Sequence, residues 1–247
     1  MRRLLKRVVV LPFRVIPNGI RRRLIQVLVH ATAAQSPRAA MRALLMSDDD
    51  VAAALNDVAV RLEGGVHVKH RLMKYHDFFV ERITPEERVL DIGCGIGAVA
   101  YSVAARAGAV VTGIDLNAEH IAFATRMFRH PKLTFIHGDA LNGLPQGSFE
   151  TVMLSNVLEH IQDRLNFLER IRRHLGPRRL LIRVPMFNRD WRIPMRQELG
   201  LSYFSDPTHY IEYTRETFER EMREARLAVV HLQINWGEIW AEVRPHA

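Results

Sequence analysis

Apolar positions along the first third of the chain recur at helical spacing. After a turn at 17–19, one helical face carries Ile20, Leu24, Val27, Leu28 and Ala31. A capping-box pattern, Ser47 with Asp50, predicts that a second helix begins there and stops at the glycine pair 64–65. The spacing predicts a third helix over 67–83. About 85 residues of helix and turn therefore precede the first strand.

From Arg88 onward, short apolar runs alternate with helical stretches. Five runs are typical of strands: RVLDI, AVVTGID, LTFIHGD, FETVMLSN and RRLLIRVP. A helical stripe separates the fourth run from the fifth, and a helix at 214–226 leads to two last runs that can pair as a hairpin. This alternation predicts parallel strands joined by crossover helices, which is an α/β fold with a doubly wound sheet.

The same pattern divides the chain into two parts. We expect residues 1–85 to form a basic helical extension and lid, and residues 86–247 to form the α/β domain. Within that domain the stretch 186–213 is long, polar and aromatic, and it follows the fifth predicted strand. We expect it to be an insertion that helps to bind a substrate.

Composition is that of a soluble globular protein, with 48% hydrophobic and 25% charged residues. The single cysteine, Cys94, excludes a disulfide framework and fits a reducing, cytoplasmic setting. The net charge of +8 is local, because residues 1–47 hold ten Arg and Lys and no acid, while the rest holds 25 basic and 27 acidic side chains. A nucleic-acid enzyme would spread positive charge around its cleft, so we expect no nucleic-acid partner.

The basic tail allows two interpretations. Its longest apolar run, 8–13, is far shorter than the roughly 20 residues that span a bilayer. A basic amphipathic segment can lie on an anionic membrane, here the inner face of the cell membrane. Alternatively, the helix packs on the α/β domain and its arginines are merely solvated. Both interpretations stay open, so the expected location is cytoplasmic, with peripheral membrane association as one option.

A glycine-rich turn follows the first predicted strand, in the stretch VLDIGCGIGAVA at 89–100. Gly93, Gly95 and Gly97 let the backbone approach a ligand closely, and they open the amino terminus of a helix. In a parallel sheet, ligands bind at the carboxyl ends of the strands. The turn therefore predicts a ligand site, without deciding which ligand it holds. Cys94, inside the turn, is expected to be a small packing residue.

Three acids decide between ligands, because Asp91, Asp115 and Asp139 each close one of three successive strands. Asp91 would repel a pyrophosphate and attract an ammonium group. A carboxylate at Asp115 can accept hydrogen bonds from both hydroxyls of a ribose, and one at Asp139 can accept from an adenine amino group. The set favours a sulfonium nucleoside that also carries an amino acid.

In this order, the motifs resemble the class I S-adenosylmethionine-dependent methyltransferases. The resemblance runs from Arg88 to the C-terminus and rests on VLDIGCGIG, VTGIDLN, FIHGDALNGLP, FETVMLSNVLEHI and LLIRVP. It implies a Rossmann-like seven-stranded sheet whose last strand is antiparallel, with S-adenosyl-L-methionine as cofactor. Carried over by position, the cofactor site comprises Asp91, Gly93, Gly95, Gly97, Asp115, Leu116, Asp139, Ala140 and Ser155. The helix before the first strand is implied to fold over the cofactor, where Arg71 or His70 could pair with its carboxylate.

The stretch SNVLEHI after the fourth strand bears on the acceptor. It lacks the Pro-Pro-aromatic pattern of nucleic-acid amino-methyltransferases, and its LEH run resembles small-molecule methyltransferases of the ubiquinone-biosynthesis type. In some of those enzymes a Glu and a His near this position have been linked to a divalent metal. Because Asn156 stands where a further Glu would help, we expect no metal. Glu159 and His160 are expected to act in the active site, the alternative being a helix start with an acid that favours the dipole.

Within the insertion, Asp206 and His209 stand close together in the sequence SDPTHY. Attack of a hydroxyl on a sulfonium methyl needs a base to take its proton, and histidine is the usual choice. His209 is therefore the candidate base, with Asp206 to orient it. Alternatively, this stretch is a turn that carries a surface histidine.

Together these features predict an S-adenosylmethionine-dependent methyltransferase that methylates an oxygen of a small-molecule, glycan or lipid-linked acceptor. Two alternatives belong to other classes: a nicotinamide-dependent oxidoreductase, and a catalytically silent scaffold at a membrane. The three intact strand-end acids argue against the scaffold, because a silent domain has no need of all three.

Overall fold

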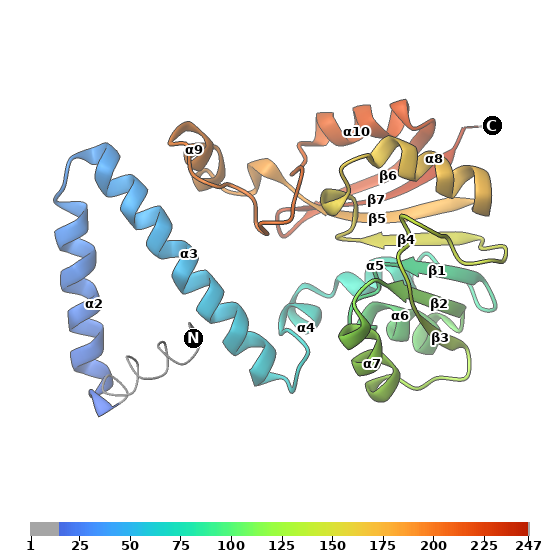
Figure 1. Cartoon of the computed structure of the whole chain (residues 1–247), viewed down its shortest axis with the longest axis horizontal. Coiled ribbons are helices and arrows are strands. Elements are labelled where there is room, and N and C mark those ends of the chain that lie inside the picture. The colour runs from blue at the N-terminus through green and yellow to red at the C-terminus, as the bar shows by residue number, and fades with distance from the viewer. Residues whose placement is uncertain (1–14, 247) are drawn as a thin grey trace.

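The computed structural model describes residues 15–246, and a seven-stranded sheet forms its centre (Figure 1). The strand order is β3-β2-β1-β4-β5-β7-β6. Neighbours from β3 to β5 pair in parallel, whereas β7 runs antiparallel to both β5 and β6. This confirms the predicted doubly wound α/β sheet, including the antiparallel last strand.

The strands are β1 (Arg88–Ile92), β2 (Val110–Asp115), β3 (Leu133–His137), β4 (Thr151–Ser155), β5 (Arg179–Pro185), β6 (Leu227–Asn235) and β7 (Glu238–Pro245). The α-helices are α2 (Asn18–Ala33), α3 (Pro37–Leu62), α4 (Lys69–Met73), α5 (Tyr75–Val80), α6 (Ala98–Ser102), α7 (Ala118–Met127), α8 (Arg164–Leu175), α9 (Arg192–Glu198) and α10 (Arg215–Glu224). Shorter turns of helix are η2 (Val103–Ala107), η3 (Leu158–His160) and η4 (Phe187–Arg189).

Two apolar cores lie on opposite faces of the sheet, because successive residues of a strand point to opposite sides. On β5, Leu180 and Ile182 face the core under α8 and α10, whereas Leu181 faces the core under α5, α6 and η2. The central strands β1, β4 and β5 are buried on both faces, which explains why they read as nearly continuous apolar runs. Arg183 is a charged exception within this run and is also buried.

Two helix predictions were wrong in detail. Ser47 does not cap a helix, because α3 begins at Pro37 after Ser36 and the Ser47 hydroxyl donates to the Ala43 carbonyl inside it. Proline is well suited to the first turn of a helix, and this favoured the earlier start. The single helix predicted over 67–83 is two short helices, α4 and α5, broken at Lys74 with a left-handed backbone (φ 52°).

Helices α2 and α3 form an arm that diverges from the sheet (Figure 1). None of the residues of α2 is buried, and α3 is held to α9 by polar contacts, among them Arg196 with Asp49. No helix among residues 15–246 has the length and apolar character needed to cross a membrane. The apolar run at 8–13 lies outside the described residues.

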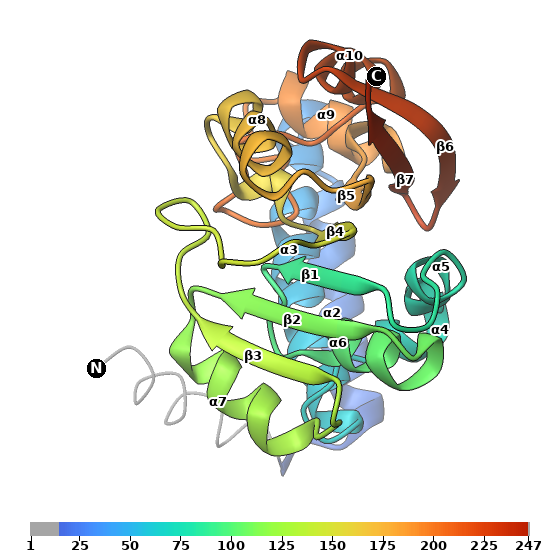
Figure 2. The same cartoon turned by 90° about the vertical axis from the view of Figure 1, so that its right-hand side faces the viewer.

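Figure 2 shows β1, β2 and β3 side by side, with their arrowheads toward the same edge. The loops that follow these strands therefore converge at that edge, as expected for parallel strands. The glycine-rich turn, Asp115 and Asp139 all lie there.

Replacing Gly97 with alanine should destabilise the fold more than the same change at Gly95. Both residues have positive φ, at 82° and 54°, so both changes carry the cost of about 1–2 kcal/mol for a left-handed alanine. Only at Gly97 would the new Cβ lie 2.5 Å from Phe135 Cζ and 2.9 Å from Ala124 Cβ, whereas nothing lies within 4 Å at Gly95. Overpacking should add about 1–3 kcal/mol at Gly97, measured by urea denaturation. Equal losses in the two variants would contradict this packing.

Candidate active site

A cavity of about 620 Å³ opens at the carboxyl ends of β1, β2 and β3. Its walls come from the glycine-rich turn, the ends of β2 and β3, and the segment after β4. Of the residues predicted from the sequence, it brings together Gly93, Gly95, Asp115, Leu116, Asp139, Ala140 and His160. The sequence motifs are therefore gathered by the topology into one site.

Two positions of the glycine-rich turn have no room for a side chain, because neighbouring residues pack closely against them. A Cβ on Gly93 would lie 2.7 Å from a methyl of Val157, and Gly97 is as tightly confined. Gly95, in contrast, faces open space in the cavity. Its N–H donates to the Asp115 carboxylate at 2.8 Å, so the acid at the end of β2 also fixes the turn. Cys94 is buried, and burial raises the pKa of its thiol, as suits a packing residue.

The carboxyl group of Asp91 is buried, and no hydrogen bond within the described residues offsets the free-energy cost of removing it from water. Its side chain is 1% exposed, and neither carboxylate oxygen has a hydrogen-bond partner among residues 15–246. Burial, with a smaller effect of the nearby Asp115, raises the pKa of Asp91 to about 8. A cationic group placed beside it would restore the charged form.

The remaining strand-end residues differ in exposure. Leu116 is 73% exposed at the cavity rim, as a residue that covers one face of a flat ligand would be. Asp139 is exposed and accepts from the Leu141 N–H at 2.8 Å. Ser155, at the end of β4, is partly buried and does not line this cavity.

A second polar group gathers Glu159, His160 and His209 from η3 and the insertion. One donor atom of each lies within 4.8 Å of the others, so the three could hold a cation. The absence of a metal stays a prediction. Glu159 is fully buried, neither of its oxygens has a hydrogen-bond partner in the described part of the chain, and burial raises its pKa to about 7.

Asp206 is linked, through Thr208, to a different imidazole from the one predicted. Its carboxylate accepts from the Thr208 hydroxyl at 2.6 Å, and the same hydroxyl lies 2.8 Å from His160 Nδ1. Since the Thr208 proton is directed at Asp206, the hydroxyl accepts from His160 Nδ1–H, which leaves the Nε2 lone pair free. His160 lines the cavity, and burial together with nearby His209 lowers its pKa.

His209 is buried and is held by an acid that sequence analysis missed. The Glu212 carboxylate lies 3.4 Å from His209 Nδ1, and it also pairs with Arg189 and accepts from the Ser205 N–H. The two imidazole rings of His160 and His209 meet edge to face, with centroids 4.5 Å apart. Three residues after the histidine, Glu212 could have been noticed as an acid in an otherwise aromatic stretch.

Arg183 is the second residue that sequence analysis missed. Its side chain is 3% exposed, its guanidinium lies over the Tyr75 ring at 3.7 Å, and its Nε is 3.0 Å from Glu238. Nε and Nη1 make no hydrogen bond of good geometry within residues 15–246. A charged residue inside the apolar run LLIRVP was the available signal, because a buried charge needs a partner.

Neither of the two residues suggested to pair with the cofactor carboxylate lines the cavity. Arg71 is exposed, pairs with Glu63 and stays outside the cavity. His70 is partly buried and hydrogen bonds to His76 at 2.8 Å, and burial lowers the pKa of His70 to about 3. His70 is therefore neutral, and the basic side chains near it include Lys69 and Arg183.

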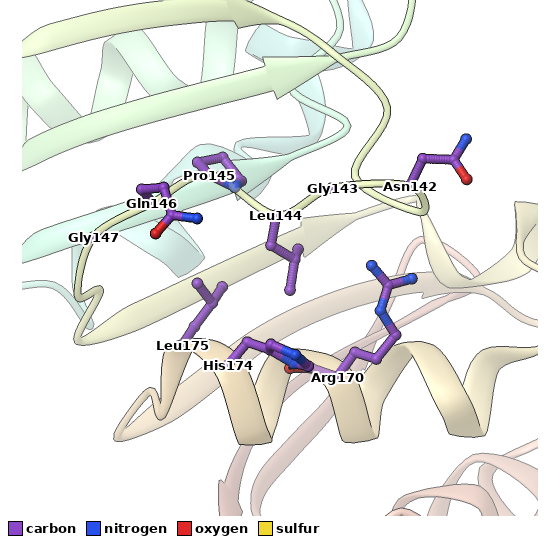
Figure 3. A pocket seen from close by; sticks show the side chains of 9 residues that line it. All are labelled: Asn142, Gly143, Leu144, Pro145, Gln146, Gly147, Arg170, His174 and Leu175. Atoms are coloured by element: carbon purple, nitrogen blue, oxygen red, sulfur yellow. The ribbon is translucent and has the colours of Figure 1, made fainter.

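Another cavity, of about 340 Å³, lies between the loop 142–147 and α8 (Figure 3). Arg170 and His174 project from α8 toward this loop, and Leu144 lies opposite Leu175. None of the strand-end acids lines it. The chemistry is concentrated in the larger cavity at the carboxyl edge.

Residues 65–232 match the family described as a methyltransferase domain. The chain belongs to this family. Membership confirms the resemblance drawn from the strand-end motifs, and it sets aside the nicotinamide-dependent oxidoreductase. The matched region begins before α4, so it includes α4 and α5 and extends into β6.

Relatives in this family differ in the atom they methylate. The chain is 34% identical over 133 residues to the ubiquinone biosynthesis O-methyltransferase of Albidiferax ferrireducens, covering 50% of this chain and 52% of that one. It is 31% identical over 111 residues to norajmaline N-methyltransferase of Rauvolfia serpentina, covering 42% and 38%. The chain thus spans about half or less of the length of these relatives.

A solved structure shares the fold. An O-methyltransferase from neocarzinostatin biosynthesis, in complex with S-adenosyl-L-homocysteine and 1,4-dihydroxy-2-naphthoic acid, superimposes with a TM-score of 0.58 at 19% identity. The match covers 82% of this chain and 60% of that one. Because the identity is low, the likeness concerns the fold alone.

Replacing Asp91 with asparagine should stabilise the ligand-free protein, increasingly so as pH rises. The folded-state pKa of about 8 lies above the ordinary value of 3.8, so between these values the unfolded chain releases a proton that the folded chain keeps. Stability of the wild type therefore falls as pH rises through this window, and the asparagine variant escapes this fall. Thermal unfolding at pH 5 and pH 8 measures the difference.

Asp139→Asn is the matched control, since it makes the same substitution at an exposed carboxyl on the same edge of the sheet. A stability gain for Asp91→Asn that is the same at both pH values would contradict the buried, protonated carboxyl.

Proposed function

We propose that this chain transfers a methyl group from S-adenosylmethionine to a hydroxyl oxygen of an acceptor, with His160 as the general base. The observation that carries the proposal is the relay from Asp206 through Thr208 to His160 at the wall of a cavity lined by strand-end acids. Family membership supports the class of reaction, and the product-bound structural relative supports the cofactor.

The residues of the cavity fit S-adenosylmethionine. Asp115 and the bare backbone at Gly95 suit the ribose, and Asp139 with exposed Leu116 suits the adenine edge and face. Asp91 does not line the cavity itself, but its neighbours Ile92 and Gly93 do, and its buried carboxyl, without a hydrogen-bond partner in the described chain, suits the ammonium group. Arg183 replaces Arg71 as the candidate to pair with the cofactor carboxylate, because its buried Nη1 has no hydrogen bond in the described chain, while its Nε lies 3.0 Å from Glu238.

When bound, this cofactor supplies a methyl group activated by the sulfonium charge. His160 accepts the proton of the attacking hydroxyl at Nε2, because Nδ1 is held by Thr208. Burial keeps His160 neutral near pH 7, so the lone pair is available. His209, predicted from the sequence as the base, supports His160 through edge-to-face contact and is itself held by Glu212. Glu159, with a carboxylate oxygen within 4.8 Å of a nitrogen of each ring, stabilises the positive charge that forms there.

A small-molecule acceptor agrees with the relatives, one of which is a ubiquinone biosynthesis O-methyltransferase. The finer possibilities expected from the sequence are a glycan and a lipid-linked acceptor. The silent-scaffold alternative has no support in this site, which keeps its acids and its histidine relay. We retain the division into an extension and lid at 1–85 and a catalytic domain at 86–247, with 186–213 as the acceptor-binding insertion.

Replacing His160 with alanine should lower turnover by roughly 10²–10⁴ and leave the affinity for S-adenosylhomocysteine nearly unchanged. Thr208→Val should cause a smaller loss, because it removes only the contact that orients the imidazole. Labelled S-adenosylmethionine and cell extract would first identify the acceptor fraction, in which turnover is then measured. Near wild-type turnover in His160→Ala, with a large loss in His209→Ala, would return the role of base to His209.

The membrane interpretation of the tail also belongs to this proposal. Every residue of α2 is exposed or only partly buried, its apolar residues include Leu24 and Leu28, and Arg21, Arg22 and Arg23 lie beside them. An amphipathic helix of this kind can rest on an anionic lipid surface. Such a placement would be peripheral, at the cytoplasmic face, and would bring the cavity close to a lipid-linked acceptor.

Changing Arg21, Arg22 and Arg23 together to alanine should weaken binding to anionic vesicles by about two orders of magnitude, since each basic residue contributes about 1 kcal/mol at such a surface. Co-sedimentation with phosphatidylglycerol vesicles at low and high salt measures this. The matched control replaces Arg215, Arg220 and Arg223 on α10, which removes the same charge elsewhere. If the wild-type chain stays in the supernatant at low salt, or both triple variants lose binding equally, α2 is not the anchor.

A further inference from the structure

A separate cavity of about 670 Å³ lies between α3, the insertion and the turn that joins β6 to β7. It is as large as the cavity at the strand ends, and no residue lines both. Its walls carry six charged residues and three aromatic rings, contributed by Tyr203, Phe204 and Trp236. The site described above leaves this cavity without a role.

The six charged residues of this cavity, three Asp and three Arg, have no net formal charge, and each of them forms an ion pair. Arg192 lies 3.0 Å from Asp48 and 2.7 Å from Asp190, and Arg196 lies 2.8 Å from Asp49. The cavity therefore has no net charge to attract an ion. Asp48, Asp49 and Arg192 are nevertheless exposed enough to offer further donors and acceptors, and Asn56 adds an amide. This chemistry suits a neutral ligand with many hydroxyl groups.

Trp236 lies at the rim of this cavity, and its backbone conformation is strained. Its φ is 55°, a left-handed conformation that is unusual for a bulky residue, in a turn completed by Gly237 at 72°. Asparagine is preferred at this position of such a turn. The indole is 68% exposed, so burial in the core does not repay the strain. Backbone strain that brings an aromatic ring to a cavity points to contact with a ligand.

The cavity adjoins the reaction site through one thin segment. Ser205 and Pro207 face this cavity, whereas Thr208 faces the cofactor cavity. A series of aromatic rings also connects the two cavities. The ring centroids of Tyr203 and Phe204 are 4.5 Å apart, and those of Phe204 and His209 are 6.4 Å apart. A ligand held here would lie across the segment 205–208 from the cavity that His160 lines.

The strained turn is also connected to the buried histidine. A Cβ on Gly237 would lie 2.6 Å from Arg189 Cβ, so the turn rests directly on Arg189. Arg189 pairs with Glu212, which in turn holds His209. Contact at Trp236 and the position of the imidazole pair therefore share one set of packed residues.

We propose that this cavity binds a sugar ring of the acceptor, which Trp236 covers with its apolar face while the paired Asp and Arg groups bind the hydroxyls. The inference rests on the proposed methyltransferase function and narrows its acceptor to a glycan or glycoside. A ring face of C–H groups packs on an aromatic surface, and the hydroxyls around its edge meet alternating donors and acceptors. A purely aromatic acceptor would find too many charged groups here.

The test uses the full-length protein, loaded with S-adenosylhomocysteine, and a panel of p-nitrophenyl glycosides of glucose, galactose, mannose, rhamnose and N-acetylglucosamine. Saturation-transfer NMR detects contact with the sugar protons, and p-nitrophenol is the probe without a sugar. At least one glycoside should bind more tightly than p-nitrophenol. Trp236→Asn should weaken that binding at least tenfold, without loss of thermal stability, because asparagine tolerates the turn.

Trp191→Ala is the matched control, since this tryptophan is 65% exposed and lies outside the cavity. It should bind the glycoside as the wild type does. The proposal is overturned if no glycoside binds, if p-nitrophenol binds as tightly, or if Trp236→Asn keeps full affinity. Binding of S-adenosylhomocysteine, measured in the same samples, reports separately on the proposed function and should be unchanged in every variant.

Discussion

Burying a carboxylate beside a second acid is unfavourable in free energy. At the carboxyl edge of this sheet, Asp91 is buried in this way near Asp115. The surrounding structure keeps the side chain in place: β1 is central in the sheet, the glycine-rich turn closes over it, and Asp115 ties that turn down. The arrangement is unfavourable for a ligand-free protein and favourable for one that binds a cation. The rest of the site can be understood as a set of groups placed around this buried carboxyl.

The sequence predicted the fold well where one pattern dominates. Four of the five strands from Arg88 to Pro185 contain buried residues on one or both faces, and β3 is partly buried, so their apolar runs identify them almost to the residue. Prediction failed where local signals compete. Ser47 and Asp50 imitate a capping box inside α3, and the break at Lys74 depends on how α4 and α5 pack rather than on a proline or glycine.

The cofactor half of the site was more predictable than the acceptor half, for a physical reason. Strand-end acids are brought together by sheet topology, which the order of the motifs encodes. The relay from Asp206 through Thr208 to His160 joins η3 to an irregular segment 48 residues later. Spacing along the chain suggested His209 as the partner of Asp206, whereas the fold directs its contact to His160. Arg183 and Glu212 depend in the same way on contacts between distant segments.

Proton release on cofactor binding tests the central claim most directly. With S-adenosylmethionine titrated calorimetrically near pH 7 in two buffers of different ionisation enthalpy, the wild type should release close to one proton, because the ammonium group converts protonated Asp91 to its charged form. The Asp91→Asn variant should bind more weakly and release none. Binding by the wild type without proton release, or undiminished affinity in the variant, would contradict the account.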